Sequence, residues 1–219
     1  MAYSFNFRDV FAAREALLDG LTLTLQLTAS TFVFGFLIGL GVAATAVYGP
    51  RWARRAAHAY VEVIRNTPLI VQLFVVFFGL PSVGIKLSVF TVATIGLAIN
   101  LGAYAAEIIR AGIESIPRSQ VEAGISLGFT RAQIFRHVVL VPALRNVYPS
   151  LMSQFVLLML ATSVASQIAA PELFYAGSII QSRTYRDFEV YTVIAVVYLA
   201  LAIFLRLLFA VAYGLVFRR

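Results

Sequence analysis

The chain has 219 residues, of which 61% are hydrophobic and only 12% are charged. Soluble domains are typically about 45–50% apolar and about 25% charged, so this composition excludes an ordinary soluble protein and leaves no room for a second, soluble domain. The net charge of +7 would suggest nucleic acid as a partner of a soluble protein, but basic residues of membrane proteins mainly mark cytoplasmic loops, and no nucleic acid is expected. The absence of cysteine excludes disulfides and thiolate metal sites.

The N-terminal segment lacks the basic region and short apolar core of a cleavable signal, so the first span is expected to act as the targeting signal. Apolar and charged residues over 7–19 form the pattern of a short amphipathic helix in the membrane interface. The first span is predicted at 21–47. Gly35 and Gly39 lie on one face of it, as a small-xxx-small surface for close helix packing.

The second span is predicted at 58–80, interrupted at 66–68, because Pro68 removes a backbone hydrogen-bond donor. Three more spans are predicted, with a short helix from 171 to about 180 between the last two. These spans cover 89–113, 138–164 and 190–217. The predicted fold is an all-α integral membrane protein with five transmembrane helices.

The charges predict how the spans are oriented. The side formed by the first and third loops and the C-terminus, Arg218 and Arg219 included, carries twelve positive and four negative residues, and the other side carries five and six. Since positive residues gather in cytoplasmic loops, the N-terminus is predicted to lie outside, and the C-terminus and the loop 115–137 in the cytoplasm.

The polar loop 115–137 carries two sequence signals for helix starts and one for a helix end. In a capping box, a hydroxyl accepts from a backbone N–H and an acid or amide three residues later reaches back to the cap. Gly128 lies between the two boxes, where a left-handed residue would end the first helix. The boxes are Ser119 with Glu122, and Thr130 with Gln133. Two short helices joined by a glycine bend are therefore predicted, as a rigid surface for a partner protein.

The same loop resembles the EAA loop of ABC importer permeases. Glu122-Ala123-Gly124 is followed by Gly128 and, nine residues on, by Val138-Val139-Leu140. Gly124 replaces the second Ala of that motif, Val138 replaces an Ile, and Pro142 comes one place late. The runs RNTPLIVQLF, FGLP and AYAAEIIR, at 65–74, 78–81 and 103–110, resemble the polar amino acid subgroup of these permeases.

The resemblance implies a single type-1 transmembrane domain over 1–219, the permease subunit of an ATP-driven importer in the bacterial cytoplasmic membrane. The solute would be a polar amino acid or a similar small polar molecule. In this family the loop, here about 115–137, forms coupling helices that sit in a groove of the ATPase subunit. The residues this assigns to ATPase coupling are Ser119, Glu122, Ala123, Gly124, Gly128 and Thr130.

The partners implied are ABC ATPase subunits, a second permease subunit, identical or different, and an extracytoplasmic solute-binding protein, besides membrane lipid. ATP and Mg would bind to the ATPase. The sequence agrees, because a P-loop requires a lysine on the phosphates and the one lysine, Lys86, lies in no such motif. No cofactor is expected on this chain.

Polar residues deep in the spans are candidates for the solute path, because a broken span exposes helix ends that can bind a carboxylate or an ammonium group. Hydrogen bonding between helices explains Ser and Thr at such positions equally well. Leu160 and Ala161 stand where relatives often carry Lys and Asp, which implies an incomplete solute site here or a different solute. The candidates are Gln72, Asn100, Tyr104, Ser153, Gln154, Thr162 and Ser163.

Two pairs with three-residue spacing, Glu62 with Arg65 and Glu107 with Arg110, lie near the inner ends of spans two and three. They are expected to pair with each other and to be structural rather than to form the path. The two histidines, His58 and His137, have no companion ligand, so no metal site is predicted.

Two other function classes remain to be tested. An ATP-independent secondary transporter or channel is the first, although such transporters often contain inverted repeats and intramembrane acids, which are not evident here. The second is a hydrolase, because residues 124–128 read G-x-S-x-G. That motif needs a strand before it and a helix after it, and neither a strand nor an orienting acid is evident, so no catalytic residue is predicted.

Overall fold

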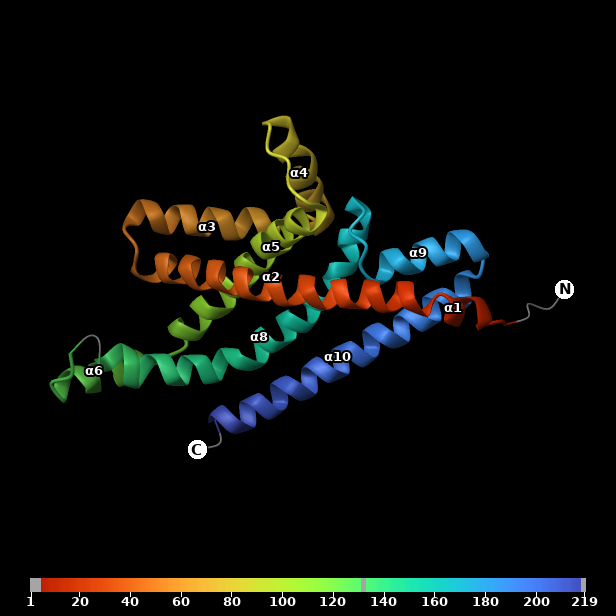
Figure 1. Ribbon diagram of the computed structural model, residues 1–219. Coiled ribbons are helices and arrows are strands. Elements are labelled where there is room, and N and C mark those ends of the chain that lie inside the picture. Colours follow the sequence, from red (N-terminus) through yellow and green to blue (C-terminus); the bar gives the residue numbers. More distant parts are fainter. Residues whose placement is uncertain (1–4, 131–132, 218–219) are drawn as a thin grey trace.

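The computed structural model describes residues 5–130 and 133–217 (Figure 1). The elements in these residues are helical, as the apolar periodicity predicted. They are α1 (Arg8–Ala12), α2 (Arg14–Tyr48), α3 (Arg51–Arg65), α4 (Leu69–Ser82), α5 (Val89–Glu114), α6 (Arg118–Ser126), the π-helical segment η1 (Ile134–Leu140), α8 (Val141–Ala161), the 3₁₀ segment η2 (Thr162–Ile168), α9 (Leu173–Thr184) and α10 (Asp187–Phe217).

Helix α5 is the centre of the packing. Buried residues make up 61% of its most apolar stretch, against 22% for α2 and 6% for α10. α2 crosses α5 through the predicted small-residue surface (Figure 1). An added Cβ at Gly35 would lie 2.7 Å from Leu101, and one at Gly39 would lie 2.6 Å from Ala105. The prediction that these glycines allow close helix packing is therefore confirmed.

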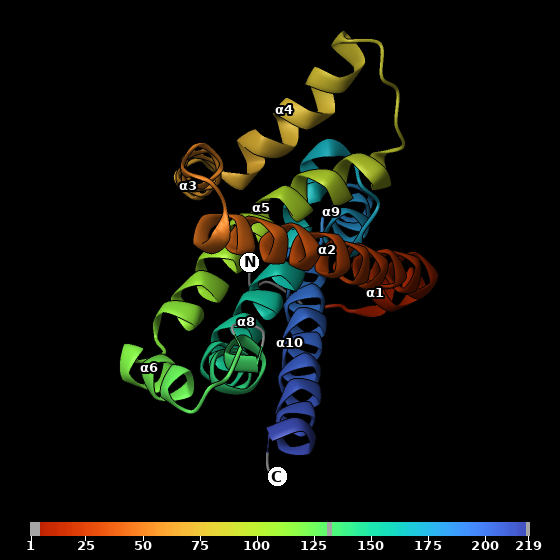
Figure 2. The same ribbon diagram turned by 90° about the vertical axis from the view of Figure 1, so that its left-hand side faces the viewer.

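The break in the second span is confirmed, but its shape differs from the prediction. α3 and α4 are bent by 106° relative to each other; α4 packs against α5 and η2, and its end farther from α3 projects beyond the other helices (Figure 2). α3 also begins at Arg51 rather than at 58. Ala53, Ala57 and Val61 are buried at a spacing of four, so the charged segment after Tyr48 forms an amphipathic helix rather than a loop.

Four helices are long and apolar enough to cross a membrane, or up to five if the bent pair counts as one span; the search covered the described residues. This agrees with the predicted number of spans. The π-helical segment, α8 and η2 form one of them, Ile134–Ile168. The other three are α2, α5 and most of α10.

The predicted N-terminal amphipathic helix is shorter than expected. α1 ends at Ala12, and the polar residues from Arg14 onward form the first turns of α2. No proline interrupts this stretch, and Gly20 is buried where α2 approaches α9, since an added Cβ there would lie 3.0 Å from Leu173. Packing against α9 therefore favours continuation of the helix over a break before the first span.

Candidate functional site

The predicted glycine bend and the second capping box are present in the loop that follows α5. Gly128 has φ +78°, and its N–H donates to the carbonyl of Ile125 at 2.9 Å. The next N–H, that of Phe129, donates to the carbonyl of Gly124 at 3.1 Å, which completes a Schellman motif at the end of α6. The box is reciprocal: Thr130 N donates to Gln133 Oε1 at 2.8 Å, and Gln133 N to Thr130 Oγ1 at 3.4 Å.

The first predicted capping box is wrong. α6 begins at Arg118 with Pro117 as its N-cap, and no side chain caps it. Ser119 and Glu122 lie inside the helix. Proline explains where the helix starts, because it disfavours the α conformation in the residue before it; α6 therefore begins directly after Pro117, and Ser119 falls in the first turn instead of at the cap.

The second short helix predicted in this loop does not form a separate element. η1 runs without a break into α8, so the chain after Gln133 enters the membrane-length helix directly. Pro142 lacks the N–H that would bond to the carbonyl of Val138, and its ring would clash there in a regular α-helix. A wider π turn just before Pro142 avoids this conflict. Arg131, counted among the cytoplasmic charges, lies outside the described residues.

Helix α6 lies at one end of the molecule (Figures 1 and 2), and the surface of this loop combines polar and apolar side chains. Glu122 and Ala123 are exposed, and Ile125, Leu127 and Phe129 are 61%, 74% and 41% exposed. We call α6 with residues 127–130 the knob. Exposed large apolar side chains on a rigid, capped helix are typical of a protein-binding surface.

Gly124, where the EAA motif has its second alanine, is the buried residue of α6. An added Cβ would lie 3.2 Å from Ile134 Cγ1, so α6 packs closely on the start of the following helix. Residues Ile116, Ile134, Val139 and Ala143 form the small apolar core beneath the knob. The knob is therefore packed against η1, at the start of the span that continues into α8.

Four of the predicted path residues lie together. Asn100 and Tyr104 of α5 and Gln154 of α8 line a cavity of about 200 Å³. Gln72 of α4 joins them, because its Oε1 accepts a hydrogen bond from Asn100 Nδ2 at 3.0 Å. Ala161 lines the same cavity. We call this the amide cavity; its walls offer amide donors, amide acceptors and a phenol.

Gln72 also closes the broken span. Its Nε2 donates to the carbonyls of Ile64 at 2.8 Å and Thr67 at 3.1 Å, backbone groups that the break leaves without helical partners. One side chain thus joins the end of α3, the start of α4 and the amide cavity.

The other three predicted path residues lie elsewhere. Ser153 is exposed and lines a separate cavity beside α10. Thr162 is fully buried, and its hydroxyl donates to the carbonyl of Met159 at 2.6 Å. The hydroxyl of Ser163 donates to the carbonyl of Leu160 at 2.7 Å. For these two residues, hydrogen bonding within their own helical segment accounts for the polar group.

One of the two predicted ion pairs is present. Arg110 Nη2 lies 2.6 Å from Glu107 Oε1, and its Nη1 lies 2.5 Å from Glu114 Oε2. The predicted Glu62–Arg65 pair is wrong. Arg65 lies 3.9 Å from Glu107 and 5.4 Å from the ring centre of Tyr104.

Glu62 instead accepts a hydrogen bond from Asn66 Nδ2 at 3.0 Å. Residue spacing on α3 could not reveal that α5 offers Arg65 a carboxylate and an aromatic face. The bent α3–α4 pair therefore places a cation beside Tyr104, at the edge of the amide cavity.

The sequence reasoning missed the role of Glu172. Its side chain is fully buried and caps α9, accepting from the N–H groups of Phe174 at 3.0 Å and Tyr175 at 2.7 Å. The hydroxyl of Tyr198 on α10 donates to it at 2.6 Å. Burial raises the pKa of Glu172, although these hydrogen bonds act in the opposite direction. An acid at the start of the helix predicted at 171 to about 180 was the available signal.

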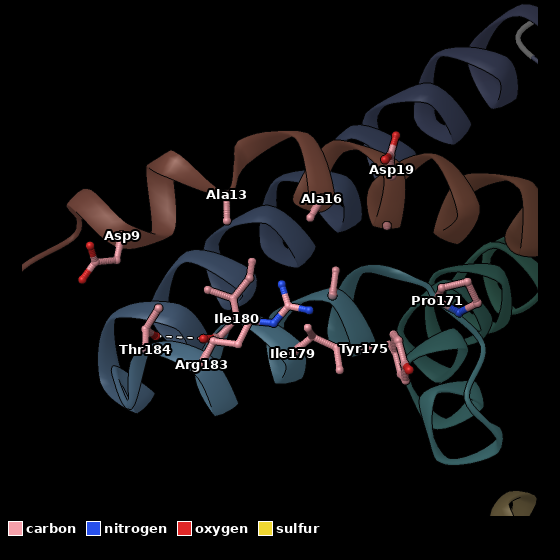
Figure 3. A pocket seen from close by; sticks show the side chains of 12 residues that line it. Asp9, Ala13, Ala16, Asp19, Pro171, Tyr175, Ile179, Ile180, Arg183 and Thr184 are labelled. Carbon is pink, nitrogen blue, oxygen red and sulfur yellow. Dashed lines mark hydrogen bonds between the residues drawn. The ribbon is translucent and has the colours of Figure 1, made fainter.

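A further cavity lies at the end of the molecule opposite the knob. It measures about 340 Å³ and lies between α9 and the start of α2 (Figure 3). Asp9, Asp19, Arg183 and Tyr175 are among its lining residues, and Ala13 and Ala16, at the start of α2, form part of its wall. Charges of both signs thus surround a mainly apolar hollow.

Residues 124–128 do not form the nucleophile elbow of a hydrolase. The G-x-S-x-G sequence lies at the end of a helix, and Ser126 Oγ donates to the carbonyl of Glu122 at 3.0 Å. A nucleophile elbow would require a strand before the serine. No group of three or more potential metal ligands was found within residues 5–130 and 133–217.

Comparisons with known proteins find that the chain is similar to permease proteins of transport systems. Residues 35–219 match the family described as binding-protein-dependent transport system inner membrane component. The chain is 37% identical over 198 residues to the probable glutamine ABC transporter permease protein GlnM of Bacillus subtilis (strain 168), covering 90% of this chain and 92% of that one. It is 40% identical over 164 residues to the L-cystine transport system permease protein TcyB of the same organism, covering 75% and 70%.

Solved structures show the same fold. A crystal structure of an amino acid ABC transporter with histidines contains a chain that is 36% identical, with a TM-score of 0.89 and coverage of 95% of this chain and 98% of that one. The MetNI methionine ABC transporter, in inward-facing conformations, is similar at 23% identity with a TM-score of 0.74, covering 90% and 94%.

Proposed function

The chain belongs to the family of binding-protein-dependent transport system inner membrane components, and from this membership we propose that it is the permease subunit of an ATP-driven ABC importer for a polar amino acid or a similar small polar solute. The names of its relatives support the solute class, since they include glutamine and cystine permeases. An ATP-independent transporter or channel is the alternative, and no feature of the described residues favours it.

The observation that carries the proposal is the knob. A short helix, ended by a Schellman motif and followed by a capping box, presents Leu127 at 74% exposure beside the exposed Glu122. In water, an apolar side chain of this size is better buried against a partner. We propose that the knob docks into the ATPase subunit, which binds ATP and Mg, and that Ser119, Ala123, Gly124, Gly128 and Thr130 shape or support this surface.

The amide cavity is the proposed part of the solute path in this subunit. A zwitterionic solute needs both donors and acceptors where water is partly excluded, and Asn100, Tyr104 and Gln154 supply them together. Ala161 contributes no charge to this cavity. Arg65, the cation at the edge of this cavity, already lies beside Glu107, so a further charge that would complete the recognition of a charged solute is expected from a second permease subunit. Ser153, Thr162 and Ser163 are expected to contribute less to the path.

The orientation follows from the charges. The knob is placed in the cytoplasm with the C-terminus, and α1 lies outside in the membrane interface with the cavity between α2 and α9. That outer end is where a solute-binding protein would deliver its cargo. A reporter inserted beside Lys86 is expected to be exported, and one inserted beside Gly128 to remain in the cytoplasm. The reverse pattern would contradict this orientation.

Uptake of radiolabelled glutamine or cystine by cells that express the chain with its ATPase and binding protein tests the proposal. Glu122→Lys is expected to abolish uptake and co-purification with the ATPase, because a reversed charge faces the partner. Gln154→Ala is expected to raise the solute concentration needed for half-maximal uptake while co-purification stays normal, because it changes the amide cavity and not the knob.

Glu15→Lys is the matched control for the charge reversal, because Glu15 is exposed near the start of α2, at the end away from the knob. It is expected to preserve co-purification with the ATPase. Normal uptake by Glu122→Lys would refute docking through the knob. Unchanged kinetics in Gln154→Ala would place the solute site on another surface.

A further inference from the structure

We propose that a cavity between α8 and α10 binds the phosphate headgroup of an anionic phospholipid through Arg206. The cavity measures about 500 Å³. Its polar groups come from Arg206, Tyr148, Ser153 and Tyr213, and the rest of its lining is apolar. We call it the Arg206 cavity.

The position of Arg206 along α10 favours an anionic partner. At about 1.5 Å per residue, Arg206 lies about 28 Å along the helix from Asp187 and about 16 Å from Phe217. A hydrocarbon core is about 30 Å thick, so a helix of this length places Arg206 within it or at its edge. A cation there is costly unless it has a partner or reaches the polar interface.

Arg206 has no carboxylate partner among the described residues. None of the ion pairs within residues 5–130 and 133–217 involves Arg206, and its side chain is exposed. A phosphate is the anion that a membrane itself supplies at this depth. Basic pockets between transmembrane helices are known to bind anionic headgroups.

Two tyrosines, Tyr148 and Tyr213, line the Arg206 cavity on the side of the C-terminal end of α10. The rings of Tyr148 and Tyr213 are 5.2 Å apart, and Phe217 packs 5.1 Å from Tyr213. Tyr148 donates its hydroxyl to the carbonyl of Phe209 at 2.8 Å, which fixes the ring between the two helices. Tyrosines are enriched at the level of lipid headgroups, where one end of the ring is apolar and the other is hydrated.

The surroundings favour a lipid over the transported solute. Tyr148 and Ser153 of α8 line the Arg206 cavity, whereas Gln154 and Ala161 of the same helix line the amide cavity, and the two cavities share no lining residue. The neighbouring α10 residues Ile203 and Leu207 are 50% and 62% exposed and could contact acyl chains. A free amino acid has no chain to cover them, whereas a phospholipid has both the phosphate and the chains.

Native mass spectrometry of the full-length chain tests the proposal. The detergent-purified chain is incubated with phosphatidylglycerol and phosphatidylcholine of identical acyl chains, and the ratio of the two retained lipids is measured. The wild type is expected to retain phosphatidylglycerol preferentially. Arg206→Gln is expected to lower this preference about fivefold, the effect of one basic residue on binding to anionic lipid, and Arg206→Lys to preserve most of it.

Arg183→Gln is the matched control, because Arg183 is an exposed arginine of α9 that does not line the Arg206 cavity. It is expected to leave the preference unchanged. Ser153→Phe should reduce phosphatidylglycerol retention by filling the cavity while the charge remains. This second variant keeps the proposal testable if Arg206→Gln does not fold, as judged by its melting temperature in phosphatidylcholine.

Three results would overturn the proposal. The first is an unchanged lipid ratio in Arg206→Gln or Ser153→Phe, and the second is an equal loss in Arg183→Gln. The third is displacement of phosphatidylglycerol by glycerol phosphate at equal concentration, which would identify a site for soluble phosphate instead. The measurement uses neither ATPase nor solute, so its outcome is independent of the proposed transport function.

Discussion

Glu172 connects three helices through one buried carboxylate. It caps α9 and accepts from Tyr198 of α10, and the next backbone N–H, that of Leu173, donates to Thr24 Oγ1 on α2 at 3.1 Å. A buried donor that loses its acceptor costs about 1–3 kcal/mol, and the carboxylate serves several donors. The end of the molecule opposite the knob therefore depends on this residue for its arrangement.

Glu172→Ala is accordingly expected to destabilise the protein by about 3 kcal/mol or more, because two N–H groups and a hydroxyl would stay buried without an acceptor. The fall in melting temperature in detergent is the measurement. Glu114→Ala is the control, since Glu114 is 57% exposed and its pairing with Arg110 is a surface interaction worth at most about 1 kcal/mol. Equal melting temperatures for the two variants would contradict this role.

The sequence predicted individual residues well where the determining interaction is local. Gly128 and the Thr130–Gln133 box follow from backbone preferences and hydrogen bonds within a few residues. Glu172 and the partner of Arg65 depend on contacts between helices distant in the chain, which residue spacing does not contain. The prediction that Ser119 caps a helix was wrong for a local reason, because α6 begins directly after Pro117.

At the scale of elements, the contact between α2 and α5 makes a sharp test possible within one helix. Gly39 and Gly41 are both in α2, but an added Cβ at Gly39 would lie 2.6 Å from Ala105 Cβ and 3.1 Å from backbone atoms of α5, whereas at Gly41 it would meet nothing within 4 Å. Backbone atoms cannot move aside without separating the helices.

Gly39→Ala is expected to destabilise the protein by about 1–3 kcal/mol through overpacking. Gly41→Ala is expected to be neutral or to stabilise by up to about 1 kcal/mol, because alanine is the better helix former. Thermal unfolding in detergent compares the two variants directly. Similar melting temperatures would show that the approach of α2 to α5 is looser than described.

The number and order of the spans were predictable because apolar runs of membrane length are a strong signal. The ends of the elements were not, for two reasons. Polar residues before a span can continue its helix, as from Arg14 into α2, and a helix that starts in a loop can enter the membrane without a break, as from Ile134 into α8. Both outcomes are decided by packing against neighbouring helices.

For the whole molecule, the knob and the hollow beside α9 belong to opposite ends. Helix α6 lies at one end, and α1 and α9, which contribute residues to the lining of the hollow, lie at the other (Figure 1). A transporter that couples ATP hydrolysis on one side to solute arrival on the other needs such an arrangement. The family to which the chain belongs is consistent with this arrangement. The central claim is that ATP hydrolysis by a partner subunit drives uptake.

Solute uptake into proteoliposomes tests that claim most directly. The chain is reconstituted with its ATPase, any second permease subunit and its binding protein, and uptake of labelled glutamine or cystine is measured with ATP or with an imposed ion gradient alone. The account predicts that uptake requires ATP and the ATPase and is lost in Glu122→Lys. Uptake driven by the ion gradient in the absence of the ATPase would contradict it.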